Sequence, residues 1–291
     1  MLQGRTVCGL VCLLGIAHAQ IPDVRVRVDV GLTARALNNA RFTTRLYDPF
    51  GRPSIVALSL YLEPGFRFYV GQRLEGIPGG PQNLLDEAYL ENEGDWRIGR
   101  QYLPFGTGKL IAESANAVRA DTNLIFEGLP VSFAAFDNGK GYAQGYNVRI
   151  GAANLGASAA FGNSIGASGT SLGVVRYPGD APGRGRGWRV AVGAHAQRRL
   201  GRFDGSLEAV LLRNGETALD DDLSVLDFSL GYRLLRRYTV VAGYSRAFEP
   251  HQNFYRLTGV IPIEQRVSLE PLVRFRNGGF YDLALTVRVR F

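Results

Sequence analysis

Any catalytic chemistry in this chain would have to rest on very few histidines, because the sequence holds only three. A hydrolase of the serine–histidine type needs a histidine beside a nucleophile and an orienting group. His195 stands between Arg189 and Arg199 in an alternating run, and His251 stands in the loop-like stretch EPHQN. Neither neighbourhood contains a nucleophile motif. We therefore expect no enzyme, and a barrel enzyme is kept as a second alternative.

Metal chemistry has one candidate, the acidic run Asp220–Asp222 with Glu216 close by. Carboxylates are the hard oxygen ligands that calcium and magnesium prefer, but this spacing matches no calcium-loop motif. Cys8 and Cys12 are the only cysteines, and both stand near the amino end. We expect a solvated acidic loop, no metal and no cofactor.

Arginine is the residue type whose spacing carries most information. In DVRVRVDVGLTAR, Arg25 and Arg27 alternate with valines, and in FYDLALTVRVRF the apolar Leu283 and Leu285 alternate with polar residues. A period of two indicates a β-strand with one apolar face and one wet face. The arginines are therefore expected on the wet faces of strands.

The same alternation continues along the whole chain, so the predicted class is all-β. The pattern gives about sixteen strands with uncertain ends. The expected windows are 24–36, 54–63, 66–73, 84–92, 95–102, 120–127, 131–137, 142–151, 155–162, 187–199, 202–213, 223–235, 238–247, 253–261, 264–276 and 279–291.

The links between these strands alternate in length. Short ones such as Pro64-Gly65 and Leu200-Gly201 follow every second strand, and longer polar links stand between them. An even strand number with this alternation predicts a transmembrane antiparallel β-barrel of about 16 strands, within a range of about 12–18, with short periplasmic turns and long extracellular loops. A closed barrel leaves no unpaired strand edge in lipid. The apolar parity should face lipid.

The first residues predict a secretory signal peptide. Arg5 precedes an apolar run that ends in the small-residue triplet Ala17-His18-Ala19. The run is shorter than the roughly 20 residues of a spanning helix. We therefore expect a signal peptide over residues 1–19 and the barrel over residues 20–291.

If the apolar parity faces lipid, the other parity faces the lumen, and arginine dominates it. Removing the leader with its single charge, Arg5, leaves a formal charge of 7 − 1 = +6. A positive lumen would raise the local concentration of anions, although internal salt bridges could neutralise part of it. The predicted pore-lining residues are Arg25, Arg27, Arg67, Arg73, Arg97, Arg149, Arg189, Arg199, Glu87 and Glu91.

The segment EAYLENEGDWRIGRQYLPFGTG, from Glu87 to Gly108, resembles outer-membrane porins, in particular the phosphate-selective and dicarboxylate-type families. The resemblance implies that the third long loop, Leu103 to Arg119, folds into the barrel and narrows it. Its charged residues, the implied constriction residues, are Lys109, Glu113 and Arg119. The terminal Phe291, with Tyr281, resembles the carboxy-terminal signal read by the outer-membrane assembly machinery.

The expected function is that of a porin in the bacterial outer membrane, a passive diffusion channel for small hydrophilic solutes with a modest anion preference. The expected partners are outer-membrane lipid, the assembly machinery and the solutes, and the resemblance implies a homotrimer. The basic run PGRGRG is expected to be a loop that binds no nucleic acid. The first alternative is a structural or surface-binding barrel with a closed lumen.

Overall fold

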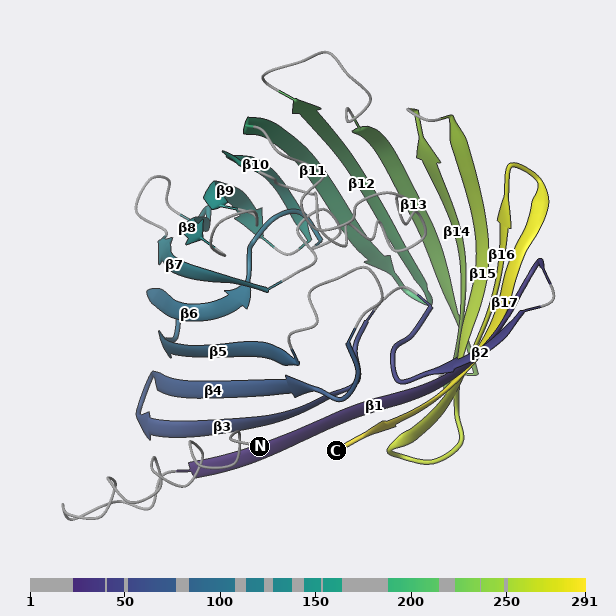
Figure 1. Ribbon diagram of the computed structural model, residues 1–291, viewed down its shortest axis with the longest axis horizontal. Helices are drawn as coiled ribbons and strands as arrows, with labels where there is room; N and C mark the ends of the chain where they lie inside the picture. Colours follow the sequence, from purple (N-terminus) through teal and green to yellow (C-terminus); the bar gives the residue numbers. More distant parts are fainter. Residues whose placement is uncertain are drawn as a thin grey trace, which may run out of the picture.

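The computed structural model describes 17 β-strands that form one antiparallel sheet (Figure 1). No helix among the described residues is long and apolar enough to cross a membrane. The predicted leader lies outside the described residues, which are 23–39, 41–49, 52–76, 84–107, 114–122, 128–137, 144–152, 154–163, 188–214, 223–235, 237–248 and 251–291. The strands are β1 Asp23–Leu37, β2 Phe42–Arg45, β3 Ile55–Glu63, β4 Phe66–Arg73, β5 Leu85–Asn92, β6 Trp96–Tyr102, β7 Ser114–Thr122, β8 Val131–Asp137, β9 Gln144–Ala152, β10 Leu155–Asn163, β11 Trp188–Leu200, β12 Phe203–Asn214, β13 Leu223–Leu234, β14 Tyr238–Ala247, β15 Gln252–Pro262, β16 Val267–Arg276 and β17 Gly279–Arg290.

The sheet closes on itself between the first and the last strand. β1 pairs with β17 through partners such as Val30 and Val289, and the backbones of Val28 and Phe291 exchange two hydrogen bonds of 2.9 and 3.1 Å. On its other flank β1 pairs with β3 in its first half and with the short β2 in its second half. β2 and β3 thus share one position, and 17 − 1 = 16 positions make up the barrel. The predicted closed, all-β antiparallel barrel is confirmed.

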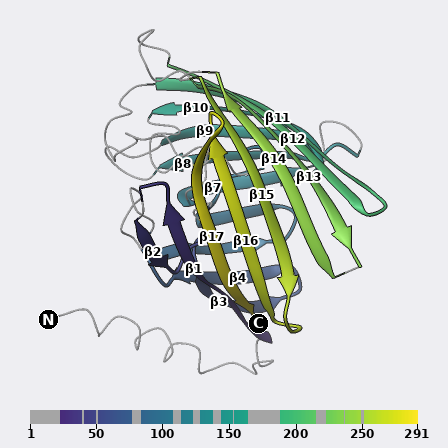
Figure 2. The same cartoon turned by 90° about the vertical axis from the view of Figure 1, so that its right-hand side faces the viewer.

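The two faces of the wall differ as the alternation predicts. In β17 the side chains of Leu283 and Leu285 are 52% and 43% exposed, whereas Asp282 and Thr286 are at most 1% exposed. Figure 2 shows β14 to β17 side by side in this wall. An apolar outer face of this extent needs an apolar environment, and a lipid bilayer provides one.

Aromatic pairs lie on the outer wall near both of its rims. Phe161 stacks on Trp188 with ring centroids 4.9 Å apart, at the end of the barrel where the long links emerge, which we call the long-loop end. Phe203 lies 4.9 Å from Tyr232 beside a two-residue connection, at what we call the short-turn end. Aromatic side chains near both rims, among them the amphipathic Trp and Tyr, are typical of the interfacial girdles of membrane barrels.

The lipid-facing assignment predicts a depth-dependent cost for charge. Leu285→Arg, in the middle of β17, should lower the free energy of unfolding in lipid by about 2–4 kcal/mol, because a midplane arginine loses its hydration. Leu234→Arg places the same charge at the short-turn rim and should cost only about 0–1 kcal/mol. Urea titrations of both variants refolded into vesicles measure the difference. Equal costs would mean that β17 does not face the bilayer.

The predicted strand at 120–127 is displaced in the structure. β7 begins at Ser114 and ends at Thr122, so the third long link ends before Ser114 and Arg119 belongs to a strand. The small residues Ala115 and Ala117, which read as loop composition, point inward and are almost fully buried. They are small because the interior at this level is filled by other side chains.

Two further corrections concern local irregularities that break the period of two. The first long link contains β2, because the chain folds back along the end of β1 before it enters the barrel. The pairing of β16 with β17 shifts between Arg274 and Phe275, so Tyr281 leaves the predicted outward parity. Its ring lies edge-on, 5.9 Å from the ring of the buried Phe254.

Candidate functional site: the barrel interior

The link after β6 turns into the barrel and crosses to the opposite strands. The carbonyl of Pro104 accepts a 3.1 Å hydrogen bond from the Asn147 amide on β9. The backbone N–H of Gly106 donates to the Ser158 hydroxyl on β10 at 3.0 Å, and that of Thr107 donates to Glu208 on β12 at 3.0 Å. We call residues Leu103–Thr107 the inward segment. Its three anchors lie on three different strands, so they fix both its position and its direction.

A glycine is required where the inward segment meets Glu208. Gly106 has a φ of +51°, in the left-handed region that disfavours side chains. A Cβ at this position would also collide with the Glu208 carboxylate. The hydroxyl of Thr107 donates to the second oxygen of the same carboxylate. Glu208 therefore holds Thr107 through two hydrogen bonds, and the glycine before it lets the backbone approach the carboxylate.

Phe105 fixes the inward segment by packing, since its side chain is only 1% exposed. The wall leaves room for the ring at Gly193, where an added Cβ would lie 3.2 Å from Phe105 Cε1. The surrounding inward residues are small, aliphatic or aromatic and form one buried cluster. Its members are Leu103, Phe105, Ala115, Ala117, Ala134, Phe136, Ala160, Ala191, Val210, Leu212, Val225, Ala247 and Phe254.

Arginines line the interior on the other side, along β4 to β7. Arg67 and Arg97 both pair with Glu91, and the contact from Arg97 Nη2 to Glu91 Oε2 is 2.6 Å. The guanidinium of Arg97 also lies 4.1 Å from the centroid of the Tyr89 ring. Arg119 pairs with Asp121 at 2.8 Å. Each of these three arginine side chains keeps 21–22% of its surface exposed, so they can still meet solvent in the lumen.

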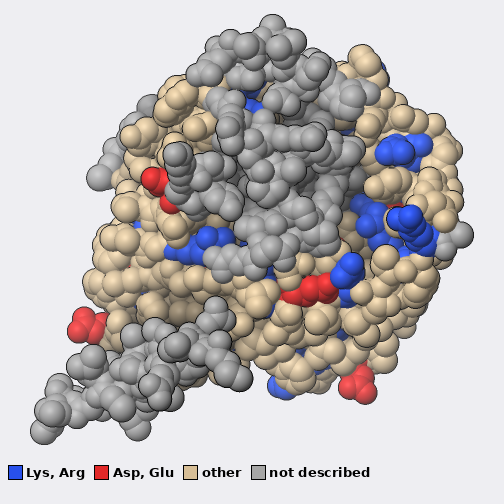
Figure 3. Space-filling model, viewed as in Figure 1, with Lys and Arg blue, Asp and Glu red and all other residues tan. Residues whose placement is uncertain are grey.

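These three arginines border a cavity of 480 Å³ at the short-turn end. Glu93 and Pro130 belong to the same lining, and Glu93 lies 3.9 Å from Arg67. In Figure 3 most of the charged side chains in view lie around the grey central region, and single charges are scattered over the outer margin. The arrangement can attract small anions and orient them, because guanidinium groups bind carboxylates and phosphates through paired hydrogen bonds.

The predicted pore-lining residues divide into exposed, half-buried and buried groups. Arg25 and Arg27 lie at the short-turn end with side chains 66% and 64% exposed, and Arg199 is exposed at the same end. Arg73 points inward but has no exposed surface, because it pairs with Asp86 at 2.7 Å. The burial of Arg73 keeps its side chain from solvent, and its predicted pore-lining role stays a prediction.

The remaining predicted pore-lining residues project from the inner face of the wall. Glu87 accepts a 3.0 Å hydrogen bond from the backbone of Tyr102, and Arg189 is buried. Arg149 contacts the Nε2 atom of His195 at 3.2 Å, on the short-turn side of the inward segment. Their inward positions follow from strand parity, whereas their role in permeation stays a prediction.

Of the three predicted constriction residues, the structure describes only Arg119. Lys109 and Glu113 lie outside the described residues, and so does the acidic run at 220–222. Arg119 faces the lumen from β7 and not from a loop. In the described ranges no group of three or more histidine, cysteine, aspartate and glutamate side chains could hold a metal ion.

Sequence reasoning missed the residues that position the inward segment. Phe105 and Gly106 were read only as part of a loop entry, although a lone aromatic before a glycine in a polar loop is a signal for a buried anchor. Asp86 was missed because the pairing of β4 with β5 shifts between Gly71 and Gln72, which turns its side chain inward. A bulge of this kind leaves no mark in the alternation.

No family model matches the chain, and none of the curated proteins does. Solved structures do match its fold along nearly the whole length. OmpT of Vibrio cholerae, folded in vitro and in its trimer form, has a TM-score of 0.62 and 9% identity and covers 93% of this chain and 99% of its own. The anion-selective porin from Comamonas acidovorans has a TM-score of 0.59 and 15% identity, with coverages of 93% and 100%.

A third match is the outer membrane channel DcaP of Acinetobacter baumannii, with a TM-score of 0.58, 12% identity and coverages of 95% and 99%. OmpT and DcaP are described as outer-membrane proteins, and the Comamonas protein is described as a porin. At these identities the likeness shows the fold. This chain therefore has the fold of outer-membrane porins.

Proposed function

We propose that this outer-membrane barrel is a passive diffusion channel for small hydrophilic solutes with a modest preference for anions. The observation that carries the proposal is the inward segment, Leu103–Thr107, which hydrogen-bonds across the interior to Asn147, Ser158 and Glu208. A barrel of about sixteen strands is wide enough for an aqueous channel. An element that crosses such a lumen narrows it, so solutes would be selected by size.

The proposed anion preference rests on the partly exposed arginines of β4 to β7. Arg67, Arg97 and Arg119 together carry three positive charges, and Glu91 and Asp121 are their close partners. The lining of the 480 Å³ cavity at one mouth holds these three arginines together with Glu91, Glu93 and Asp121, so the preference depends on the guanidinium surface that stays exposed and not on a net charge of the cavity. An exposed guanidinium group can bind a small anion through paired hydrogen bonds even where carboxylates lie close by.

A liposome swelling assay tests the channel directly. Liposomes that contain the refolded protein are placed in isotonic solutions of neutral sugars of increasing size. A size-filtering channel predicts fast swelling with the smallest sugars and a steady decrease as the sugars grow. If protease protection and heat-dependent gel migration show an inserted, folded barrel and no sugar enters, the channel proposal fails.

The first alternative, a structural barrel with a closed lumen, has one observation in its favour. The apolar cluster around Phe105 and Phe136 fills part of the interior on the side of β7 to β15. In the swelling assay this alternative predicts silence with every sugar. The enzyme alternative has no such support, because Ser158 is bound to Gly106 and His195 lies against Arg149.

We extend the proposal to assembly on the basis of the fold. One matching structure, OmpT of Vibrio cholerae, occurs in a trimer form, and we propose a homotrimer here as well. Recognition of Phe291 by the assembly machinery is proposed with it. The Phe291 side chain is 60% exposed at the short-turn end, where a partner could reach it. Cross-linking of the protein in native membranes measures the number of chains in the assembly.

A further inference from the structure

The first long link also enters the barrel, at a different place from the inward segment. After β2 the chain forms a small closed turn, in which Tyr47 and Pro53 make a β-bridge. The backbone N–H of Asp48 donates to the carbonyl of Arg52 at 2.9 Å, and the N–H of Arg52 donates to the Asp48 carboxylate at 2.8 Å. We call the described residues 46–49 and 52–54 the inner turn.

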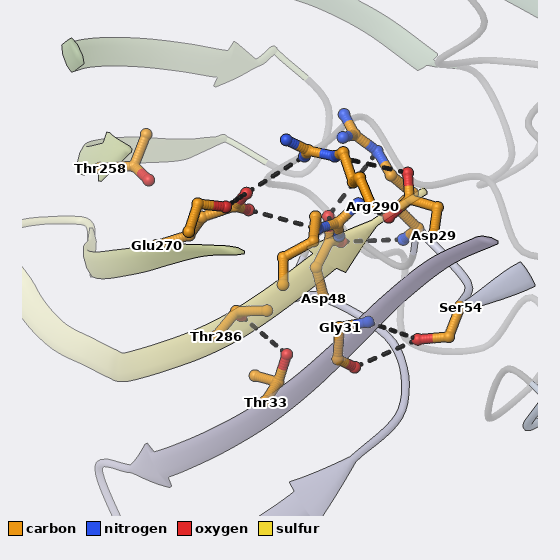
Figure 4. A network of polar contacts seen from close by, with 12 residues as sticks. Asp29, Gly31, Thr33, Asp48, Ser54, Thr258, Glu270, Thr286 and Arg290 are labelled. Atoms are coloured by element: carbon orange, nitrogen blue, oxygen red, sulfur yellow. Dashed lines mark hydrogen bonds and ion pairs between the residues drawn. The ribbon is translucent and has the colours of Figure 1, made fainter. Parts of the chain in front are cut away.

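The inner turn is fastened to the wall at both of its ends. The Ser54 hydroxyl donates to the carbonyl of Gly31 at 3.1 Å and accepts from the N–H of Gly31 at 2.8 Å (Figure 4). At the other end, the N–H of Leu46 donates to Glu75 at 2.6 Å. Asp48 is only 4% exposed although it belongs to a link between strands. The turn is therefore a packed part of the interior.

The inner turn covers two arginines of the β16–β17 wall. Asp48 Oδ2 lies 3.1 Å from Arg288, whose side chain is 1% exposed. The carbonyl of Pro49 accepts a 3.3 Å hydrogen bond from Arg274, whose side chain is 3% exposed. Both arginines stand on inward-facing positions of their strands. Without the turn, their guanidinium groups would face the lumen.

The wall supplies further carboxylates to both arginines, and Asp282 accepts two hydrogen bonds from Arg274. Arg288 also lies 3.1 Å from Asp29 and 3.5 Å from Glu270, so three carboxylates surround one guanidinium. Figure 4 shows Asp29, Asp48 and Glu270 converging on this part of the wall. A positive charge enclosed in this way presents little positive potential to a passing ion, because the surrounding negative charges cancel it at short range.

We propose that the inner turn is a charge screen that withholds Arg274 and Arg288 from permeating anions and leaves the arginines of β4 to β7 as the anion path. The screening itself is a property of the barrel interior. Its effect on ion passage rests on the proposed channel function. The two parts are tested by separate measurements.

Chemical modification of arginine tests the screening without any transport. Phenylglyoxal is applied to the folded protein in detergent, and peptide mass mapping gives the modified fraction of each arginine. In the wild type, Arg290, which is 48% exposed, should be modified, and Arg274 and Arg288 should be protected. Replacing residues 48–52 by an Asn-Gly turn should raise the modification of Arg274 and Arg288 to the level of Arg290.

Arg73 is the internal control, because Asp86 buries it on another part of the wall. Its continued protection shows that the variant has kept its fold. Protection of Arg274 and Arg288 in the shortened variant, with Arg290 still modified, would overturn the screening. Modification of both arginines in the wild type would overturn it as well. If Arg73 is also modified in the shortened variant, the comparison is repeated with Asp48→Asn in place of that variant. The modified fraction of Arg288 is then the readout.

The reversal potential across a planar bilayer in a salt gradient tests the effect on ions. Asp48→Asn should shift it toward stronger anion selectivity, because Arg288 loses one of its three carboxylates. Glu264→Gln removes the same charge from an exposed turn at the short-turn end and should leave the potential unchanged. Equal shifts in both variants, or none in Asp48→Asn, would contradict the screen. A wild type without conductance would refute the channel and leave the labelling result standing.

Discussion

Phe105→Ala is expected to lower the free energy of unfolding by about 3–5 kcal/mol, the usual cost of removing a buried phenylalanine ring. It is also expected to raise the conductance of the barrel. The ring fills the space left at Gly193 and holds the inward segment against the wall. Without it, only the four hydrogen bonds to Asn147, Ser158 and Glu208 hold the segment, so the segment should spend more time away from the wall. Chemical denaturation and single-channel recording measure the two effects.

A matched control separates these effects. Phe136 belongs to the same buried cluster, is 5% exposed and projects from the strand β8. Phe136→Ala should lower stability by a similar amount, about 3–5 kcal/mol, because it leaves a comparable cavity. It should change conductance much less, since no hydrogen bond of the inward segment starts from β8. Equal conductance changes in the two variants would mean that the segment does not define the constriction.

Neutralising the arginines of β4 to β7 is expected to remove the anion preference. Replacing Arg67, Arg97 and Arg119 by glutamine takes three positive charges from the lumen wall while keeping a polar side chain at each position. The reversal potential in a salt gradient should move from the anion side toward the cation side. The shift should shrink at 1 M salt, where the screening length falls to about 3 Å.

The control for this triple variant changes the same charge elsewhere. Arg202 and Arg237 lie in exposed connections at the short-turn end, and Arg246 stands on the outer face beside Phe248. Replacing these three by glutamine also removes three positive charges and should leave the reversal potential near its wild-type value. A shift of the same size in both triple variants would show that total charge, and not the lumen wall, sets selectivity.

Strand alternation predicted the barrel and most of its inward residues because one face of each strand meets lipid and the other does not. The parity of Leu283, Leu285 and Thr286 in β17 follows from this alone. Tyr281 and Asp86 could not be assigned, since register shifts at bulges move one residue out of the period without changing composition. Parity shows which face of the strand a side chain lies on, but not how far other residues bury it. The buried Arg73 and the partly exposed Arg67 therefore could not be told apart in the sequence.

The inward segment was expected from resemblance, but its mechanism of attachment depends on long-range contacts. Thr107 and Glu208 are 101 positions apart, and only the barrel brings them together. The inner turn was not expected at all. Its Asp48 lies 240 positions from Arg288 in a link that reads as an ordinary polar loop. Contacts across the lumen form only because the barrel closes and brings distant strands together. A single sequence indicates this closure only through the number of its strands.

The central claim is that the lumen is open and conducts ions past the inward segment. Single-channel recording of the purified, refolded protein in a planar bilayer tests it most directly. An open channel should give discrete current steps of uniform size that scale with salt concentration, together with a reversal potential on the anion side. Repeated insertion of a demonstrably folded barrel without current steps would contradict the channel and favour the barrel with a closed lumen.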